Sequence, residues 1–281
     1  MNPRDIWVIA RFELDRHLRS RQTIVAGVLL IALSAYGSYR LAEYADQIAK
    51  VGRELGPGLS MVAGMIEEVT GLPALAISGL LSKHPPVLVA LFALVILMMP
   101  LVTLTLAYDQ TATDIETRHV RYLLFRSDRV SIYLGKSLGA WMFVAGAVGL
   151  VLAMFGVFLG LRSDALEGVR GIVYLGKIWV TATAYALPFI ALLGLASALV
   201  GRARRSLSVT ILFWIGVGIA AGLLGLADED FAKVAYLFPT QDRFELLVDD
   251  LRPKASLVVY LLAYTLVAGG LGLWRFRSRD L

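Results

Sequence analysis

The amino-acid sequence predicts an all-α integral membrane protein with six transmembrane helices and with both termini on the cytoplasmic side. A helix of about 20 apolar residues can span the hydrocarbon layer, because its backbone amides are satisfied internally. The chain of 281 residues is 58% hydrophobic and 17% charged, which is too apolar for a soluble domain of this length. As one transmembrane domain over 1–281, it has apolar stretches near 23–40, 87–108, 138–161, 178–201, 207–227 and 257–274.

The basic residues predict the orientation of these spans. With the amino terminus inside, the cytoplasmic segments are 1–22, 109–137, 202–206 and 275–281. They hold most of the 27 Lys and Arg residues, and such an excess marks cytoplasmic loops. Arg202, Arg204 and Arg205 crowd into one very short loop, which strengthens the assignment. The net charge of +5 follows from this bias, so we expect no nucleic-acid partner.

Residues 3–21 predict an amphipathic interfacial helix on the inner membrane surface. Asn2 suits an N-cap and Pro3 the first helical position. An apolar stripe then recurs every four residues, at Ile6, Ala10, Leu14 and Leu18. Two interpretations stay open, a plain membrane anchor and a helix that also touches a cytoplasmic partner. Because this segment is long and carries acidic residues, we expect the first span to be a retained helix and not a signal peptide.

The outer loop over 41–86 is too long for a simple connector. Its apolar run over 72–81 is too short to span a bilayer, which predicts an amphipathic or re-entrant helix. The last outer loop has a short apolar face before Pro239. We expect both outer loops to form caps on the outer membrane surface.

The inner loop over 109–137 predicts a charged amphipathic helix. It begins with Asp109 and continues with alternating acidic and basic residues, while Ile115, Tyr122 and Leu123 share one helical side. A charged helix in a cytoplasmic loop has two interpretations. It is either a solvated connector or a docking helix that enters a groove on a soluble protein.

Several functional classes are disfavoured by what the sequence lacks. There are no cysteines, so disulfides and thiolate sites are excluded. Gly135, Lys136 and Ser137 imitate the end of a nucleotide-binding loop, but Val130 stands where the leading glycine belongs. No two histidines have ligand spacing. We therefore predict no catalytic residue, metal site or nucleotide site in this chain. Glycine pairs such as Gly135 and Gly139 predict close helix packing, within one bundle or between subunits.

The arrangement of short motifs around six apolar stretches resembles the permease subunits of ABC-2 type ABC exporters, over nearly the whole chain. The motifs that carry the resemblance are Ala10-Arg11-Phe12-Glu13-Leu14, Leu106-Ala107-Tyr108-Asp109, the acidic pair Asp114 and Glu116, Arg121-Tyr122-Leu123-Leu124, and Leu134-Gly135-Lys136. Each motif alone is weak, and the specificity comes from their order along the chain.

The resemblance implies a subunit of an ATP-driven exporter in a bacterial or archaeal cytoplasmic (inner) membrane. Two permeases, either two copies or this chain with a sister permease, would pair in the bilayer above cytoplasmic ATPase subunits. Those partners would bind ATP and Mg²⁺, so no cofactor is expected in this chain. The loop over 114–126 would be the coupling helix. The docking residues implied are Asp114, Glu116, Arg118, Arg121 and Tyr122, with Glu13 and Arg19 as secondary contacts.

A membrane scaffold or sensor that recruits a soluble partner without transport is the alternative function. It would share the docking loop with an exporter but would not need two outer caps. The apolar spans favour a hydrophobic or amphipathic cargo, and the sequence does not distinguish lipid, peptide, drug or polysaccharide precursor. An ATPase with a phosphate-binding loop encoded beside this gene would discriminate the two classes.

Overall fold

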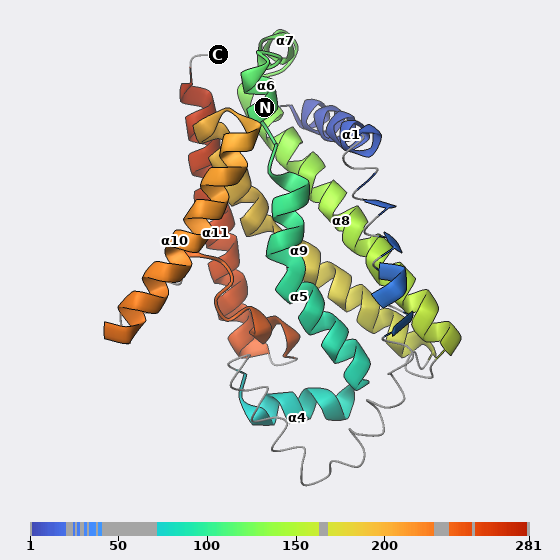
Figure 1. The fold of residues 1–281 in the computed structure, drawn as a ribbon. Helices are drawn as coiled ribbons and strands as arrows, with labels where there is room; N and C mark the ends of the chain where they lie inside the picture. Colours follow the sequence, from blue (N-terminus) through green and yellow to red (C-terminus); the bar gives the residue numbers. More distant parts are fainter. Residues whose placement is uncertain are drawn as a thin grey trace.

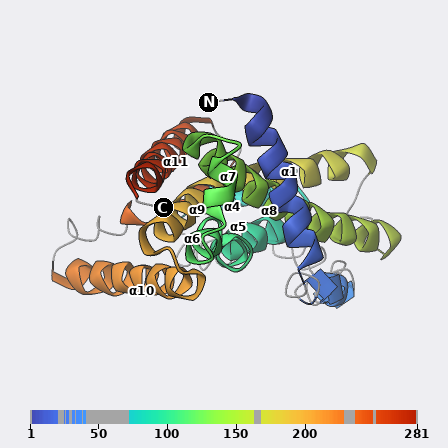
Figure 2. The ribbon, with the colours of Figure 1, turned by 90° about the horizontal axis from the view of Figure 1, so that it is seen from above.

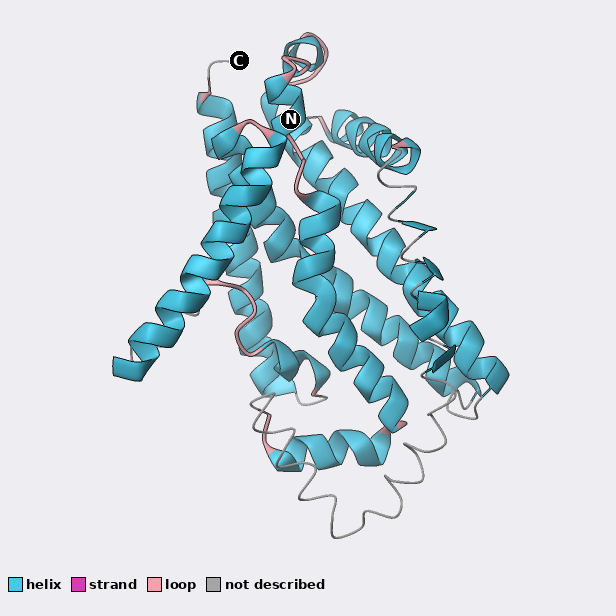
Figure 3. Ribbon diagram, in the orientation of Figure 1, coloured by secondary structure: helices cyan, strands magenta, loops and turns pink. Residues whose placement is uncertain are grey.

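The computed structural model describes residues 2–20, 25, 27–28, 31–32, 34–37, 39–40, 72–162, 168–227, 236–248 and 251–279. Within these ranges the chain is helical and no strand occurs (Figure 3). The prediction of an all-α fold is therefore confirmed. In the expected span at 23–40, the described residues are helical but discontinuous, and most of the outer loop at 41–86 lies outside the described residues, so six spans remain a prediction.

Five described helices are long and apolar enough to cross a membrane. Their bounds are α5 (Pro86–Ala107), α8 (Arg129–Arg162), α9 (Gly168–Val200), α10 (Ala203–Ala227) and α11 (Leu251–Ser278). Their apolar residues cover nearly the whole circumference, as expected for helices that face lipid on one side and other helices on the other.

Helix α9 lies at the centre of the bundle and α10 at its margin. In its most apolar window, 67% of α9 is buried, against 11% of α10. The core consists of large side chains from α5, α8 and α9, including the fully buried Phe92, Leu159 and Phe189. Helix α10 leaves the bundle at an angle, so that most of its length stands apart from the other helices (Figure 1).

Both ends of the chain and the connection between α5 and α8 lie at one end of the bundle (Figure 1). We call this the near end, and the opposite one the far end. Helix α4 (Ala74–Lys83) and the short helix η3 (Arg243–Leu247) lie at the far end. Leu72 and Ile77 pack there against Phe244 and Val248. The short helix expected over 72–81 thus corresponds to α4, which runs crosswise to the long helices.

At the near end, α1 (Pro3–Arg19) lies across the first turns of α8 (Figure 2). Its start has the predicted caps, because the Asn2 side chain accepts from the Arg4 amide at 3.1 Å and Pro3 opens the helix. The two helices touch at the glycine pair of α8. A Cβ added to Gly139 would lie 2.8 Å from the Ala10 carbonyl oxygen. The close packing predicted for Gly135 and Gly139 therefore brings α1 against α8 within one chain.

The single helix expected over 114–126 was wrong, because the structure has two short helices there. They are α6 (Ala112–Glu116) and α7 (Val120–Leu124). Between them Arg118 adopts the left-handed conformation, with φ of 59°, and an α-helix cannot continue through such a residue. Val120 then packs with Ile132 and Tyr133 of α8. Burial of this valine turns the chain back toward the bundle.

Candidate functional site at the junction of α1, α6 and α8

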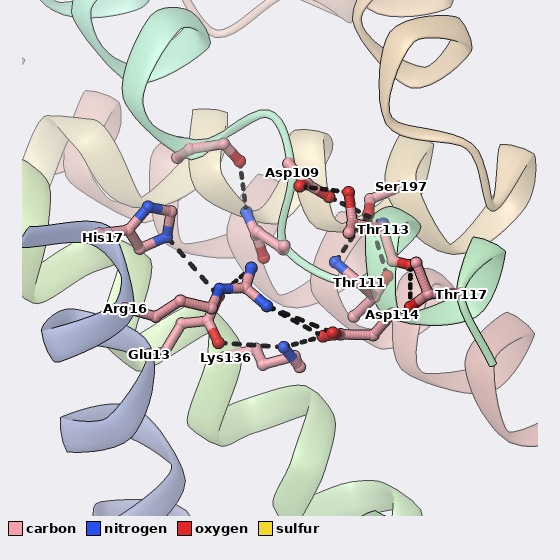
Figure 4. Close-up of polar contacts among 12 residues, drawn as sticks. Glu13, Arg16, His17, Asp109, Thr111, Thr113, Asp114, Thr117, Lys136 and Ser197 are labelled. Atoms are coloured by element: carbon pink, nitrogen blue, oxygen red, sulfur yellow. Dashed lines mark hydrogen bonds and ion pairs between the residues drawn. The ribbon is translucent and has the colours of Figure 1, made fainter. Parts of the chain in front are cut away.

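Lys136 lies at the centre of a buried charge cluster (Figure 4). It belongs to the second turn of α8 and is 2% exposed. Its Nζ lies 3.0 Å from Oε2 of Glu13 on α1 and also pairs with Oδ2 of Asp114 on α6. Both carboxylates are buried as well, at 1% and 4% exposure. Lys136 is therefore a counter-ion shared by α1 and α6, two helices that lie far apart in the sequence.

Arg16 of α1 supplies the second cation of the cluster. Its Nη1 lies 3.2 Å from Asp114 Oδ1, and its Nη2 lies 2.7 Å from Glu13 Oε1. The pairing with Glu13 Oε1 is an ion pair without hydrogen-bond alignment, because that oxygen has no hydrogen-bond partner. Two cations thus face two carboxylates. This balance matters because a buried charge without a counter-ion costs several kcal/mol.

His17 borders the cluster on the α8 side. Its Nε2 lies 3.6 Å from Glu13 Oε1, and its ring stacks on Phe143 with centroids 5.1 Å apart. Burial lowers the pKa of His17 below its ordinary value of 6.5, because the charged imidazolium loses its hydration. The nearby Glu13 carboxylate opposes this shift without cancelling it. The structure therefore favours the neutral imidazole.

The turn that leads into α6 is held by the side chain of Asp109. Its Oδ1 accepts the Thr113 amide at 2.9 Å and its Oδ2 accepts the Thr113 hydroxyl at 2.6 Å. These bonds satisfy a backbone donor at the start of a helix, where no intrahelical partner exists. They fix where α6 begins, and so they fix the position of Asp114 one residue further.

Two buried polar residues tie the same turn to the long helices. Gln110 donates to the Ile190 carbonyl of α9 at 2.8 Å and accepts from the Ser137 hydroxyl of α8 at 3.0 Å. The Thr111 amide donates to Ser197 Oγ of α9 at 2.9 Å. Because buried hydrogen bonds are costly to break, α6 is anchored to α8 and α9 independently of the charge cluster.

The end of α11 closes the near end of the bundle. Arg129, at the start of α8, donates to the backbone carbonyls of Arg277 and Arg279, the latter at 2.8 Å. Arg279 in turn donates to the Ala198 carbonyl at the end of α9 at 2.9 Å. Cations near the ends of helices α9 and α11 satisfy carbonyls that lack intrahelical donors. The start of α8 and the ends of α9 and α11 are therefore linked to one another at the near end.

Beyond this junction, the α6–α7 turn projects from the bundle (Figure 1). We call five of its exposed side chains the near-end tip: Glu116, Arg118, Arg121, Tyr122 and Phe125. Tyr122 is 70% exposed and Phe125 is 85% exposed. Two aromatic rings in solvent beside charged groups are typical of a surface that contacts another protein.

The candidate docking residues fall into two groups. Glu116, Arg118, Arg121 and Tyr122 lie at the tip, and Arg19 is exposed at the end of α1. Glu13 and Asp114, by contrast, are inside the molecule, where Lys136 and Arg16 neutralise them. We therefore revise the expectation that these two carboxylates contact a partner, because their side chains are not accessible to one.

Sequence reasoning missed Lys136 and Phe125. The sequence predicts Lys136 in a cytoplasmic loop, since the apolar stretch begins only after it, whereas α8 begins at Arg129. If the helix had been predicted to begin at Arg129, Lys136 would have been a charged residue inside it, and such a residue indicates a buried counter-ion. Phe125 gave no signal, because exposure of one phenylalanine depends on the path of the turn. In the described part of the chain, no three His, Asp or Glu side chains are grouped as a metal site requires.

The five long apolar helices indicate a multi-pass membrane protein. Residues 7–281 match the family model described as ABC-2 family transporter protein, and the chain belongs to this family. A comparison with curated proteins found no match. The predicted resemblance to ABC-2 permeases is thereby confirmed, and with it a place among the membrane components of transport systems.

Proposed function

We propose that this chain is the membrane-spanning permease subunit of an ATP-driven ABC-2 type exporter. It would rest on a separate cytoplasmic ATPase subunit and pair with a second copy or a sister permease in a bacterial or archaeal cytoplasmic membrane. The family match over residues 7–281 and the long apolar helices support this assignment. The excess of Lys and Arg residues at the near end supports a cytoplasmic location for that end of the bundle.

The observation that carries the proposal is the contrast between the exposed tip and its buried base. Glu116 and Phe125 are accessible to a soluble protein, while Asp114, two residues before Glu116, pairs with Lys136 inside the bundle. A short helix with exposed aromatic and charged side chains fits a groove on a partner. A displacement of the tip would act on α8 through Lys136 and on α1 through Glu13.

ATP and Mg²⁺ would be bound by the ATPase partner, so the permease would need no cofactor of its own. This chain would contribute the membrane-spanning helices, which would adopt two arrangements that bind the ATPase with different affinity. We propose outward movement of a hydrophobic or amphipathic cargo. The apolar surfaces of the long helices support such a cargo, since they can contact the apolar part of the molecule as it crosses the membrane.

A co-purification experiment tests the proposal. The tagged chain is extracted from its native membrane in a mild detergent, and the proteins that co-purify with it are identified and quantified by mass spectrometry. We expect equal recovery of the ATPase with the wild type and its loss with Glu116→Lys. Asp15→Lys, which reverses an exposed carboxylate on α1, is the matched control and should retain the ATPase. Recovery of a partner without ATPase activity would instead favour a membrane scaffold.

A further inference from the structure

A group of aromatic rings lies toward the far end, between α9, α10, α11 and the segment 236–248. We call it the far-end aromatic cluster, and its members are Tyr185, Phe189, Trp214, Phe238 and Tyr260. The ring centroids of Tyr185 and Phe189 are 5.1 Å apart, and those of Trp214 and Phe238 are 4.7 Å apart. Phe189 contacts both of the latter rings edge to face.

Three buried polar atoms in and beside this cluster have no hydrogen-bond partner among the described residues. They are the Tyr185 hydroxyl, the Trp214 Nε1 and the Arg243 Nε. All three are hydrogen-bond donors, and the Tyr185 side chain is only 1% exposed. An unsatisfied buried donor costs about 1–3 kcal/mol. Three such donors on three separate elements indicate a site for an acceptor that the chain itself does not provide.

The segment that carries Phe238 and Arg243 is held firmly by α11. The Tyr260 hydroxyl donates to the Tyr236 carbonyl at 2.6 Å, and the Tyr264 hydroxyl donates to the Leu237 carbonyl at 3.1 Å. These phenols satisfy consecutive backbone carbonyls of the segment. The unpaired Arg243 Nε therefore lies on a segment whose backbone is bonded to α11, while Tyr185 and Trp214 belong to the long helices α9 and α10.

Arg243 gives this region a positive charge. Its guanidinium lies over the Phe244 ring, 5.0 Å from the centroid. In the described part of the chain no carboxylate forms an ion pair with Arg243. The neighbouring Asp242 accepts instead from the Tyr236 hydroxyl at 2.8 Å. Arg243 therefore adds a cation to the two neutral donors of this region.

The cluster also borders a lipid-facing surface. Trp214 belongs to α10, and the neighbouring Phe213 and Ile215 of that helix are exposed. Helix α10 diverges from the bundle toward its carboxyl end (Figure 1). A molecule dissolved in the bilayer can therefore approach Trp214 from the side, with its chain along the apolar surface of α10.

We propose that the far-end aromatic cluster and Arg243 bind the anionic head of an amphipathic molecule, a carboxylate or phosphate with an aliphatic tail. Arg243 supplies the charge, Tyr185 and Trp214 donate to its oxygens, and the aromatic rings pack the first methylene groups. This inference rests on the proposed function and names a class of cargo for it.

The test measures binding to the full chain in nanodiscs of phosphatidylcholine. The probe is radiolabelled dodecyl phosphate, with dodecyltrimethylammonium and inorganic phosphate as competitors. Arg243→Gln should weaken binding by about tenfold or more, since it removes a charge-assisted hydrogen bond. Arg170→Gln removes an exposed arginine from α9 and should bind as the wild type does.

Two conservative variants keep the test decisive if Arg243→Gln fails to fold. Trp214→Phe and Tyr185→Phe preserve a ring and remove only the donor, and each should weaken dodecyl phosphate binding. Equal affinity in wild type and both conservative variants would overturn the proposal. Effective competition by the cationic amphiphile, or by inorganic phosphate at the same concentration, would also overturn it. Because the assay needs neither ATPase nor transport, its failure leaves the permease assignment intact, and the converse holds.

Discussion

Lys136 and Glu13 join two helices across 123 positions of sequence, with Nζ 3.0 Å from Oε2. The same ammonium group pairs with Asp114 of α6. The amino-terminal helix and the α6–α7 turn therefore share one counter-ion, and neither can move away from α8 without exposing a buried charge. We infer that this linkage carries displacement of the near-end tip to α1.

Replacement of Lys136 by methionine should destabilise the near end. Met retains most of the side-chain volume but leaves two buried carboxylates with Arg16 alone, and the loss of a partner from a buried ion pair costs about 3–5 kcal/mol. Because the chain has no cysteine, Ala10→Cys at a fully buried site of α1 gives a clean reporter. Maleimide labelling at residue 10 should be faster in Lys136→Met than in the parent.

The control for that experiment is Arg204→Met, which removes an exposed cation at the start of α10. It should leave labelling at residue 10 unchanged. Equal labelling rates for the Lys136 variant and this control would contradict the role of Lys136 in holding α1.

Gly139→Ala should displace α1 because the added methyl group meets backbone. Its Cβ would lie 2.8 Å from the Ala10 carbonyl oxygen, and backbone cannot give way as a flexible side chain can. We expect destabilisation of about 1–3 kcal/mol, measured as a lower thermal unfolding midpoint in detergent. Gly146→Ala in the same helix is the matched control, since nothing lies within 4 Å of its added Cβ. That variant should be neutral or slightly stabilised by better helix propensity.

The stability of the near end should decrease on acidification through His17. Burial lowers the pKa of His17 below 6.5, so the folded state binds fewer protons than the unfolded state. The free energy of unfolding therefore rises with pH up to the unfolded pKa and is level above it. Protonation is opposed by Arg16 and Lys136 and favoured by Glu13 and Asp109. Thermal midpoints between about pH 5 and about pH 8 measure this slope.

His17→Phe should reduce that pH dependence, because phenylalanine retains the stacking partner of Phe143 but does not titrate. A variant whose midpoint falls with acidification as steeply as that of the wild type would assign the effect to another group.

Phe125→Ala should weaken association with the ATPase without lowering stability. The ring is 85% exposed and makes little contact with the rest of the chain, while aromatic anchors often dominate the binding energy of an interface. The ratio of ATPase to permease after co-purification measures the effect. Phe12→Ala, at an exposed position of α1, should leave the ratio as it is in the wild type.

Much of the helical architecture was predictable from the sequence, and the pairing of charges was not. Long apolar runs predict spanning helices because few other structures satisfy their backbone in lipid, and Asn2 with Pro3 correctly predicts the start of α1. Asp114 and Glu13 carry formal charges, which favoured surface positions. Their burial depends on Lys136 and Arg16, which come from different helices, and such contacts are set by tertiary packing.

The division of the predicted coupling segment into α6 and α7 has a similar origin. The sequence around Arg118 contains no glycine or proline to mark a break. Arg118 adopts the left-handed conformation, and two residues later Val120 is buried against α8. A local pattern cannot reveal a turn that a distant helix stabilises.

Nucleotide-dependent labelling of α1 tests the central claim most directly. The Ala10→Cys chain is reconstituted with its ATPase, and maleimide labelling is compared with and without ATP. We expect ATP to change the labelling rate in this parent chain and to have no effect after the further change Lys136→Met. Equal labelling of the parent with and without ATP, while ATP is hydrolysed, would contradict transmission from the tip to α1.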